Sequence, residues 1–147
     1  MTTFTGTQET FVEAVKNLVE LEYDTKEAYE EAIKRLEYNS NKTKLREFCE
    51  DHEKHIIALS KLLQNHNEQA PVQSKGIKSW ISKGKVIIAD IVGDRSILLA
   101  MASNEKDTNK AYERMNARHD RWDDSKNILK IALADEKRHK EWLEKQT

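Results

Sequence analysis

Residues 22–30 read EYDTKEAYE, and residues 105–113 read EKDTNKAYE. Six of these nine positions are identical, and the two stretches lie about 83 residues apart. A second match follows each of them in the same order, because residues 51–55 read DHEKH and residues 135–139 read DEKRH. The sequence therefore predicts a duplicated structural unit.

Apolar residues around both copies recur at intervals of three or four, which is the period of a helix. The composition agrees, since 35% of the residues are charged, 37% are hydrophobic, and the chain has only four glycines and one proline. This balance favours long helices with one apolar stripe over a sheet protein with many turns. We expect four long helices, at about residues 11–36, 42–66, 95–118 and 120–145.

The helix ends are predicted from side chains that compete with the helical backbone. Thr7 or Thr10 is expected to cap the first helix. Residues 39–41, Asn-Ser-Asn, are expected to break the chain between the first two helices, because such side chains form local backbone hydrogen bonds. Gly93 is predicted to stop the preceding segment and Asp94 to cap the third helix.

The fold class predicted is all-α, a four-helix bundle made of two repeated hairpins within one domain, residues 1–147. Hairpin one covers about residues 8–66 and hairpin two about 94–146. The crossover between them, 67–93, is long enough to join the hairpins as in four-helix bundles with a long crossover connection. An up-down bundle without a crossover is the alternative, and it leaves residues 70–92 to be explained in another way. An amphipathic stretch, 77–92, predicts a short helix inside it.

The net charge, the cysteine count and the length of the apolar runs argue against several classes of protein. A net charge of -1 argues against a nucleic-acid binder. The single cysteine, Cys49, excludes an intrachain disulfide, fits a reducing compartment and is expected to be a buried structural thiol. The first six residues lack the features of a signal peptide, and no apolar run is long enough to span a bilayer. We therefore expect a cytoplasmic protein with no membrane contact.

Helical spacing also places carboxylate and imidazole side chains, which are common metal ligands, on the same helix face. Residues three apart share a helix face, so Glu136 and His139 can present a carboxylate and an imidazole to one point, as can the pair His52 and His55. Glu22 and Glu105 fall where the apolar stripes of their helices would otherwise continue. Burying an unpaired carboxylate is unfavourable by several kcal/mol, roughly, which favours metal ligation there over an exposed position. Tyr29 and Tyr112, seven residues further on, are expected to be core aromatics whose hydroxyls reach a ligand carboxylate.

These residues resemble the ferritin-like superfamily, in which a Glu from each of two helices joins a Glu-x-x-His from each of the other two. The Glu-to-Tyr spacing and the Asp-Glu-x-x-His motif look like rubrerythrin-type domains and like small bacterial ferritin-like domains of unknown function. The resemblance implies a metal-binding protein that holds two iron ions, with zinc or manganese as alternatives. Oxygen or peroxide would be the substrate of an oxidase, peroxidase or ferroxidase. A homodimer is the assembly considered for the chain. The implied metal ligands are Glu22, His52, His55, Glu105, Glu136 and His139.

One position departs from that pattern, because His52 stands where the family has Glu. Two divalent ions carry four positive charges, and three carboxylates neutralise three of them. The site would then recruit an anion or hydroxide, hold a single metal, or favour zinc, since imidazole suits many metals. Asp51 and Asp135 are expected to be outer partners that hold a histidine N–H. A non-catalytic structural or stress-related bundle, metal-free or stabilised by zinc, is the alternative function.

Overall fold

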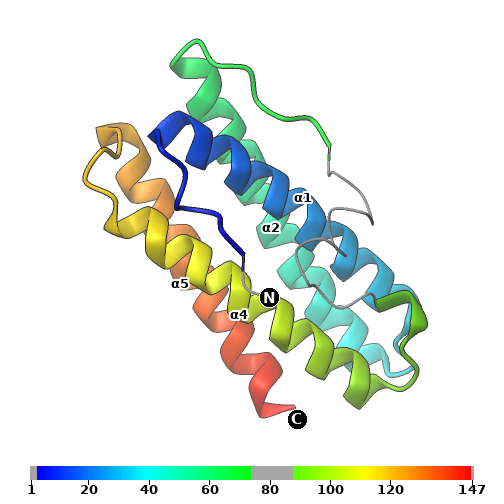
Figure 1. The fold of residues 1–147 in the computed structure, drawn as a ribbon. Coiled ribbons are helices and arrows are strands. Elements are labelled where there is room, and N and C mark those ends of the chain that lie inside the picture. The colour runs from blue at the N-terminus through cyan, green and yellow to red at the C-terminus, as the bar shows by residue number, and fades with distance from the viewer. Residues whose placement is uncertain (1–2, 74–87, 147) are drawn as a thin grey trace.

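The computed structural model describes residues 3–73 and 88–146. Four long helices pack as two hairpins, α1 on α2 and α4 on α5, which lie side by side (Figure 1). The predicted all-α fold of two hairpins is confirmed. The helix bounds are Phe11–Arg35 for α1, Asn39–Asn65 for α2, Asp94–Ala117 for α4 and Lys126–Lys145 for α5, with short 3-10 turns η1 at Ile88–Asp90 and η2 at Asp123–Ser125. None of the described helices is both long enough and apolar enough to cross a bilayer.

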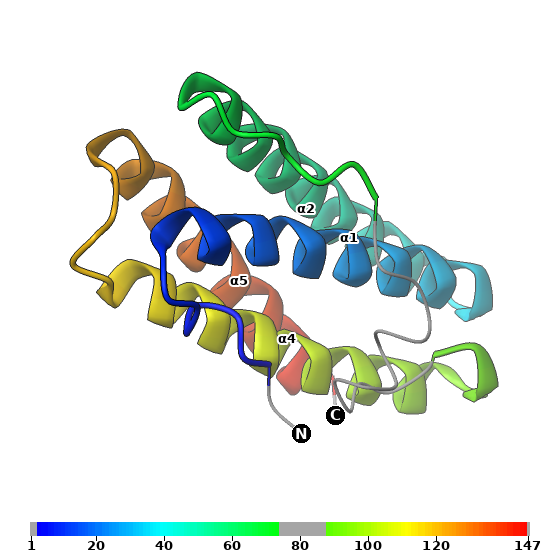
Figure 2. The same cartoon turned by 45° about the horizontal axis from the view of Figure 1, so that its top comes forward.

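The ends of α2 and α4 show how the two hairpins are joined. Asp94, the first residue of α4, contacts Tyr38 and Asn41 at the start of α2. At the other end, His66 after α2 stacks on Trp122, which follows α4. The two helices therefore run parallel, so that α2 ends at the opposite end of the bundle from the start of α4 (Figure 2). This is the arrangement that the predicted crossover requires. Most of the short helix predicted at 77–92 lies outside the described residues. In the part that is described, residues 88–90 form η1.

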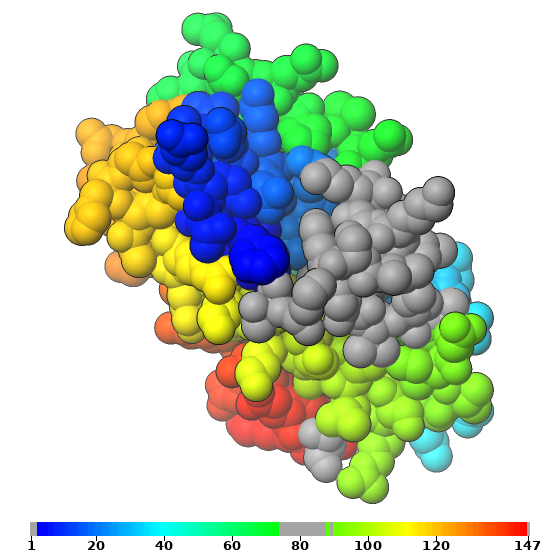
Figure 3. Space-filling model, in the orientation of Figure 1, coloured from blue at the N-terminus to red at the C-terminus, as the bar shows by residue number. Residues whose placement is uncertain are grey.

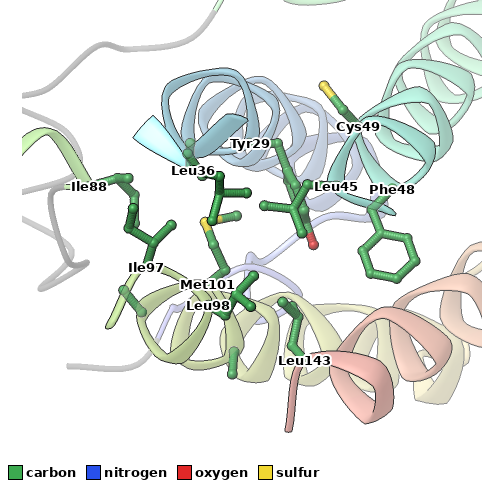
Figure 4. Packing of buried hydrophobic residues seen from close by; sticks show 14 residues of the cluster. Tyr29, Leu36, Leu45, Phe48, Cys49, Ile88, Ile97, Leu98, Met101 and Leu143 are labelled. Carbon is green, nitrogen blue, oxygen red and sulfur yellow. The ribbon is translucent and has the colours of Figure 1, made fainter. Parts of the chain in front are cut away.

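Two separate clusters of buried apolar side chains fill the two ends of the bundle. The first, shown in Figure 4, takes residues from 28–49 of the first hairpin and 88–102 and Leu143 of the second. The second takes residues from 11–21 and 59–63 of the first hairpin and 111–132 of the second. On each of the four long helices, the candidate metal ligands lie between the residues of the first cluster and those of the second. The fold therefore positions these residues at mid-height, between two apolar layers. Cys49 is buried in the first cluster, as expected.

The N-terminal segment, residues 3–9, lies along α4 (Figure 3). Arg114 donates to the carbonyl oxygen of Thr3 at 2.5 Å, and Arg118 donates to that of Gly6 at 2.9 Å. Thr10 then caps α1, since its hydroxyl accepts from the backbone N–H of Glu13 at 3.2 Å. Of the two predicted caps, the second is correct.

The boundary between α1 and α2 differs from the prediction. Residues 39–41 lie inside α2, and the break comes earlier, at the extended residue Leu36. The reason is a tertiary contact, because the Asp94 carboxylate accepts from the backbone N–H groups of Glu37 at 2.8 Å and Tyr38 at 3.1 Å. Asp94 therefore does not cap its own helix as predicted. Gly93 occupies the N-cap position of α4, at a φ of 93°.

The fourth long helix also begins later than the predicted residue 120, at Lys126 after η2. Trp122 has extended backbone and packs its ring against Phe11 and His66, which holds it outside the helix. Ile131, an apolar residue of this helix, is 54% exposed. The buried stripe of α5 instead runs through Leu129, Ala132, Glu136, His139 and Leu143, and Ile131 falls off that stripe.

Candidate metal centre

All six candidate ligands meet at mid-height in the bundle. Each of the four long helices contributes, with Glu22 from α1 and Glu105 from α4 facing pairs from α2 and α5. Five of the six side chains are fully buried, and His55 is 5% exposed. A concentration of three carboxylates and three imidazoles in a protein interior is unfavourable unless they neutralise one another or bind cations.

The six residues form two overlapping groups, each of which could hold a metal ion. One consists of Glu22, His52, His55 and Glu136, and the other of His52, Glu105, Glu136 and His139. Within each group, one donor atom from every residue lies within 4.8 Å of the others. His52 and Glu136 belong to both groups, and they occupy equivalent places in the two copies of the repeat. The duplication of the chain therefore produces two half-sites that share a centre.

Several polar atoms at this centre have no hydrogen-bond partner among the described residues. They are Glu105 Oε2, both carboxylate oxygens of Glu136, and His139 Nδ1. Buried polar atoms are nearly always satisfied, and leaving one unpaired is unfavourable by about 1–3 kcal/mol. These atoms are oxygen and imidazole nitrogen donors, which is the donor chemistry that iron, manganese and zinc accept. The residues present therefore fit a metal centre.

The two terminal histidines are each held by an aspartate from the other hairpin. His55 Nε2 lies 2.9 Å from Asp135 Oδ2, and His139 Nε2 lies 2.8 Å from Asp51 Oδ2. These are the histidine contacts predicted for the two aspartates, and the structure adds that they cross between the hairpins. Because each Nε2 is engaged outward, each Nδ1 faces the centre, where His55 Nδ1 lies 2.9 Å from Glu22 Oε2. Metal-ligating histidines are commonly oriented in this way.

Two supporting residues were not predicted from the sequence. Arg138 Nη2 lies 2.8 Å from Asp51 Oδ2 and 3.2 Å from Asp135 Oδ1, so that one guanidinium joins both outer carboxylates. Asn109 donates to the backbone carbonyls of Glu105 and Glu136, at 2.8 and 2.9 Å, and connects α4 to α5 beside the candidate ligands. The signal for Asn109 was its position one turn after Glu105 on the buried face. Arg138 is adjacent to His139 in a highly charged helix, and no pattern distinguished it.

The two tyrosines of the repeat differ in their contacts. The Tyr29 hydroxyl donates to Glu105 Oε1 at 2.5 Å, as predicted. The Tyr112 hydroxyl is buried and has no hydrogen-bond partner among the described residues, so the predicted contact with a ligand carboxylate is absent there. Burial raises the pKa of both phenols well above 10, and nearby carboxylates add to the shift. Both tyrosines are therefore neutral across the physiological range.

The pKa values of the carboxylates separate strongly in this environment. Burial alone would raise the pKa of Glu22, but the charges of His52 and His55 outweigh it and lower the value to about 2. Glu136 behaves in the opposite way, because burial and the negative charge of Glu105 raise its pKa to about 7. Glu136 is therefore the carboxylate of the centre that most readily holds a proton when no cation is bound.

The three histidines all favour the protonated form. Burial opposes it, yet Glu22 and Asp135 raise the pKa of His55 to about 12. The hydrogen bond to Asp51, with Glu105, similarly raises the pKa of His139 to about 10 against burial. The pKa of His52 also lies well above 6.5, since Glu136 and Glu22 outweigh its burial. Metal binding at this centre must therefore displace protons.

Aromatic rings limit the access of water to the centre. Phe48 packs on His139 with ring centroids 4.2 Å apart, and Tyr29 packs on His52 at 5.0 Å. Figure 4 shows Tyr29 and Phe48 among the apolar residues of the first cluster. A low local dielectric strengthens every electrostatic contact made there.

Comparison with known proteins gives a family without an assigned activity. No curated protein and no solved structure matches this chain. Residues 10–117 match the family described as a domain of unknown function, DUF2383. The matched region includes Glu22, His52, His55 and Glu105 and ends before α5, which carries Glu136 and His139. Since the match covers well over half of the chain, this protein belongs to the DUF2383 family.

Proposed function

We propose that this protein binds two metal ions, with iron as the principal metal, in a ferritin-like centre, and that it oxidises ferrous iron with oxygen or peroxide. The observation that carries the proposal is the pair of overlapping ligand groups that share His52 and Glu136 in the buried middle of the bundle. The ligand order along the chain and the crossover between two hairpins support the likeness to ferritin-like proteins. Iron bound there would supply the electrons that reduce oxygen or peroxide.

The chain's own residues have separate parts in this function. Glu22 and His55 would hold one ion, and Glu105 and His139 the other, with Asp135 and Asp51 fixing the orientation of the two imidazoles. Glu136 Oε1 lies 3.4 Å from His55 Nδ1, and Glu136 Oε2 lies 3.7 Å from His139 Nδ1. One oxygen therefore faces each half-site, so this carboxylate could bridge the two ions. The apolar clusters above and below the centre exclude bulk water. A single cysteine cannot form a four-cysteine iron site, so this chain's own residues supply no rubredoxin-type electron donor.

The first test is the number of metal ions per chain. Full-length protein would be stripped with chelator, reconstituted anaerobically with ferrous iron, desalted and measured by inductively coupled plasma mass spectrometry. We expect about two irons per chain, followed by rapid oxidation of ferrous iron when oxygen or peroxide is added. A chain that binds no metal under these conditions would overturn the proposal.

Variants at the centre connect the metal to these ligands. Glu136→Gln combined with His139→Ala should abolish binding of at least one ion and remove the metal-dependent rise in thermal stability. Glu141→Gln is the matched control, because Glu141 lies on the same helix and its side chain is 70% exposed. If the double variant bound metal and gained stability as the wild type does, the ligand assignment would fail.

A second candidate function rests on the charges of the centre. With the raised pKa values of His52, His55 and His139, three imidazolium ions can neutralise three carboxylates without any metal. The bundle would then be a metal-free structural protein. Equal thermal stability with and without metal would favour this alternative, and stoichiometric zinc without redox chemistry would favour a zinc-stabilised bundle.

A further inference from the structure

His52 differs from the other two histidines of the centre in how its ring is held. A histidine that ligates a metal through one nitrogen usually donates the other ring N–H to an outer carboxylate or carbonyl. His55 and His139 follow this rule, with Asp135 and Asp51 as their outer partners. Both nitrogens of His52 instead face ligand carboxylates, since Nδ1 lies 3.2 Å from each oxygen of Glu22 and Nε2 lies 3.1 Å from Glu105 Oε1.

The ring of His52 therefore extends from one half-site to the other. Glu22 belongs only to the first ligand group and Glu105 only to the second. His52 is fully buried and occupies the place in the repeat that Glu136 occupies in the other copy. Glu136 spans the two half-sites with its two oxygens, and His52 spans them with its two nitrogens.

We propose that His52 bridges the two metal ions as an imidazolate, with Nδ1 on the ion held by Glu22 and His55 and Nε2 on the ion held by Glu105 and His139. This inference rests on the proposed binding of two metal ions and adds the mode by which they are joined. Two metal–nitrogen bonds form, both N–H bonds of the protonated imidazole are broken, and the two protons leave to solvent. No electron is transferred.

The charge of the centre supports a bridging imidazolate. Three carboxylates neutralise three of the four positive charges of two divalent ions, which leaves one charge in a buried site. An imidazolate carries one negative charge and restores neutrality without an additional anion. The departure of His52 from the carboxylate pattern is then a substitution of one singly charged bridge for another.

The bridge also sets the separation of the ions. The lone pairs of the two ring nitrogens diverge, so an imidazolate holds its ions farther apart than the roughly 3.5–4 Å typical of two-metal sites. A histidine bridge and a carboxylate bridge are therefore distinguishable by the magnetic coupling between the two ions. The coupling should depend on His52 if the histidine is the bridge and on Glu136 if the carboxylate is.

Copper(II) provides a probe that does not depend on activity. Stripped full-length protein would be loaded with two equivalents of copper(II), and total copper would be compared with the copper visible by electron paramagnetic resonance. In the wild type we expect two coppers per chain with most of the signal lost, because an imidazolate bridge couples the two spins antiferromagnetically. Adding acid should protonate the bridge and restore the signal before the helical circular dichroism is lost.

Two variants identify the bridging residue. Glu136→Gln should retain the loss of signal in every chain that still binds two coppers, whereas His52→Gln should bind copper that is fully visible. Loss of coupling in Glu136→Gln but not in His52→Gln would assign the bridge to the carboxylate and overturn the inference. If His52→Gln does not fold, Glu136→Gln decides, because coupling that persists without the Glu136 carboxylate must pass through His52, and coupling that is lost assigns the bridge to Glu136. Two fully visible coppers, or one copper per chain, would refute the histidine bridge and leave metal binding intact, whereas no bound copper or iron would refute both.

Discussion

Asp51 of the first hairpin accepts a hydrogen bond from His139 of the second, with Oδ2 2.8 Å from Nε2. The reciprocal pair, Asp135 and His55, has the same geometry at 2.9 Å. Each hairpin therefore orients the histidine of the other, and the two half-sites depend on correct docking of the hairpins. Arg138 contacts both aspartates and links the two pairs.

The first prediction concerns these outer aspartates. Asp51→Asn and Asp135→Asn should each weaken metal binding by about 10–100-fold, because an amide orients the imidazole less strongly and reduces its basicity. Metal affinity would be measured by competition with a chromophoric chelator. Glu53→Gln on the exposed side of α2 is the control and should leave the affinity unchanged. Equal affinities in all four proteins would show that the aspartates are only surface partners of Arg138.

The second prediction concerns the pH dependence of the metal-free protein. The pKa of Glu136 is raised from 4.5 to about 7, so its stabilising proton is fully present below pH 4.5 and is lost as the pH rises through 7. The pKa of His139 is raised from 6.5 to about 10, so that stabilisation is present below pH 6.5 and is lost as the pH rises through 10. In chelator, the free energy of unfolding should therefore fall as the pH rises from 5 toward 9, roughly.

Excess metal should reverse this trend. Metal replaces the bound protons, so its affinity and its contribution to stability increase as the pH rises through the same range. Urea denaturation at several pH values, with chelator and with metal, measures both curves. A metal-free protein that became more stable toward pH 9 would contradict the protonated centre.

The third prediction compares the two tyrosines. Tyr29→Phe removes the donor to Glu105 and should destabilise the metal-free protein by about 1–3 kcal/mol. Tyr112→Phe removes a buried hydroxyl that has no hydrogen-bond partner among the described residues, so it should be neutral or slightly stabilising. Urea denaturation in the presence of chelator measures the two changes. Similar losses in both variants would contradict this difference between the two hydroxyls, and no loss in either would mean that the tyrosines act only through the packing of their rings.

The fourth prediction concerns the segment that lies on α4. A Cβ at Gly6 would lie 2.6 Å from Arg114 Cβ, and the residue has a φ of +96°. Gly6→Ala should therefore destabilise the protein by about 1 kcal/mol or more, through both strain and displacement of the segment. Gly93→Ala is the matched comparison, because Gly93 has a φ of +93° with no atom within 4 Å of the added Cβ. Thermal unfolding should show a smaller loss for Gly93→Ala, and the reverse order would contradict this account.

The helical residues of the site were predictable because their signal is local. A helix repeats every 3.6 residues, so a carboxylate or imidazole in phase with an apolar stripe must be buried wherever that stripe is. Glu22, His52, Glu105, Glu136 and His139 are all fully buried as this argument requires. The helix ends were less predictable. Asp94 reads as a cap for its own helix, but it binds backbone groups 56 and 57 residues away.

The sequence by itself determined the four helices, the duplication and the set of six side chains that face the core, since each depends on spacing within one helix or on identity between two copies. Tertiary structure alone decided that Asp51 holds His139 and that Asp135 holds His55. It also decided that Tyr29 reaches Glu105 while Tyr112 has no such contact, and that the two nitrogens of His52 face the carboxylates of Glu22 and Glu105. These contacts join different helices, so they depend on the rotation and height of one helix against another, which periodicity within a helix does not specify.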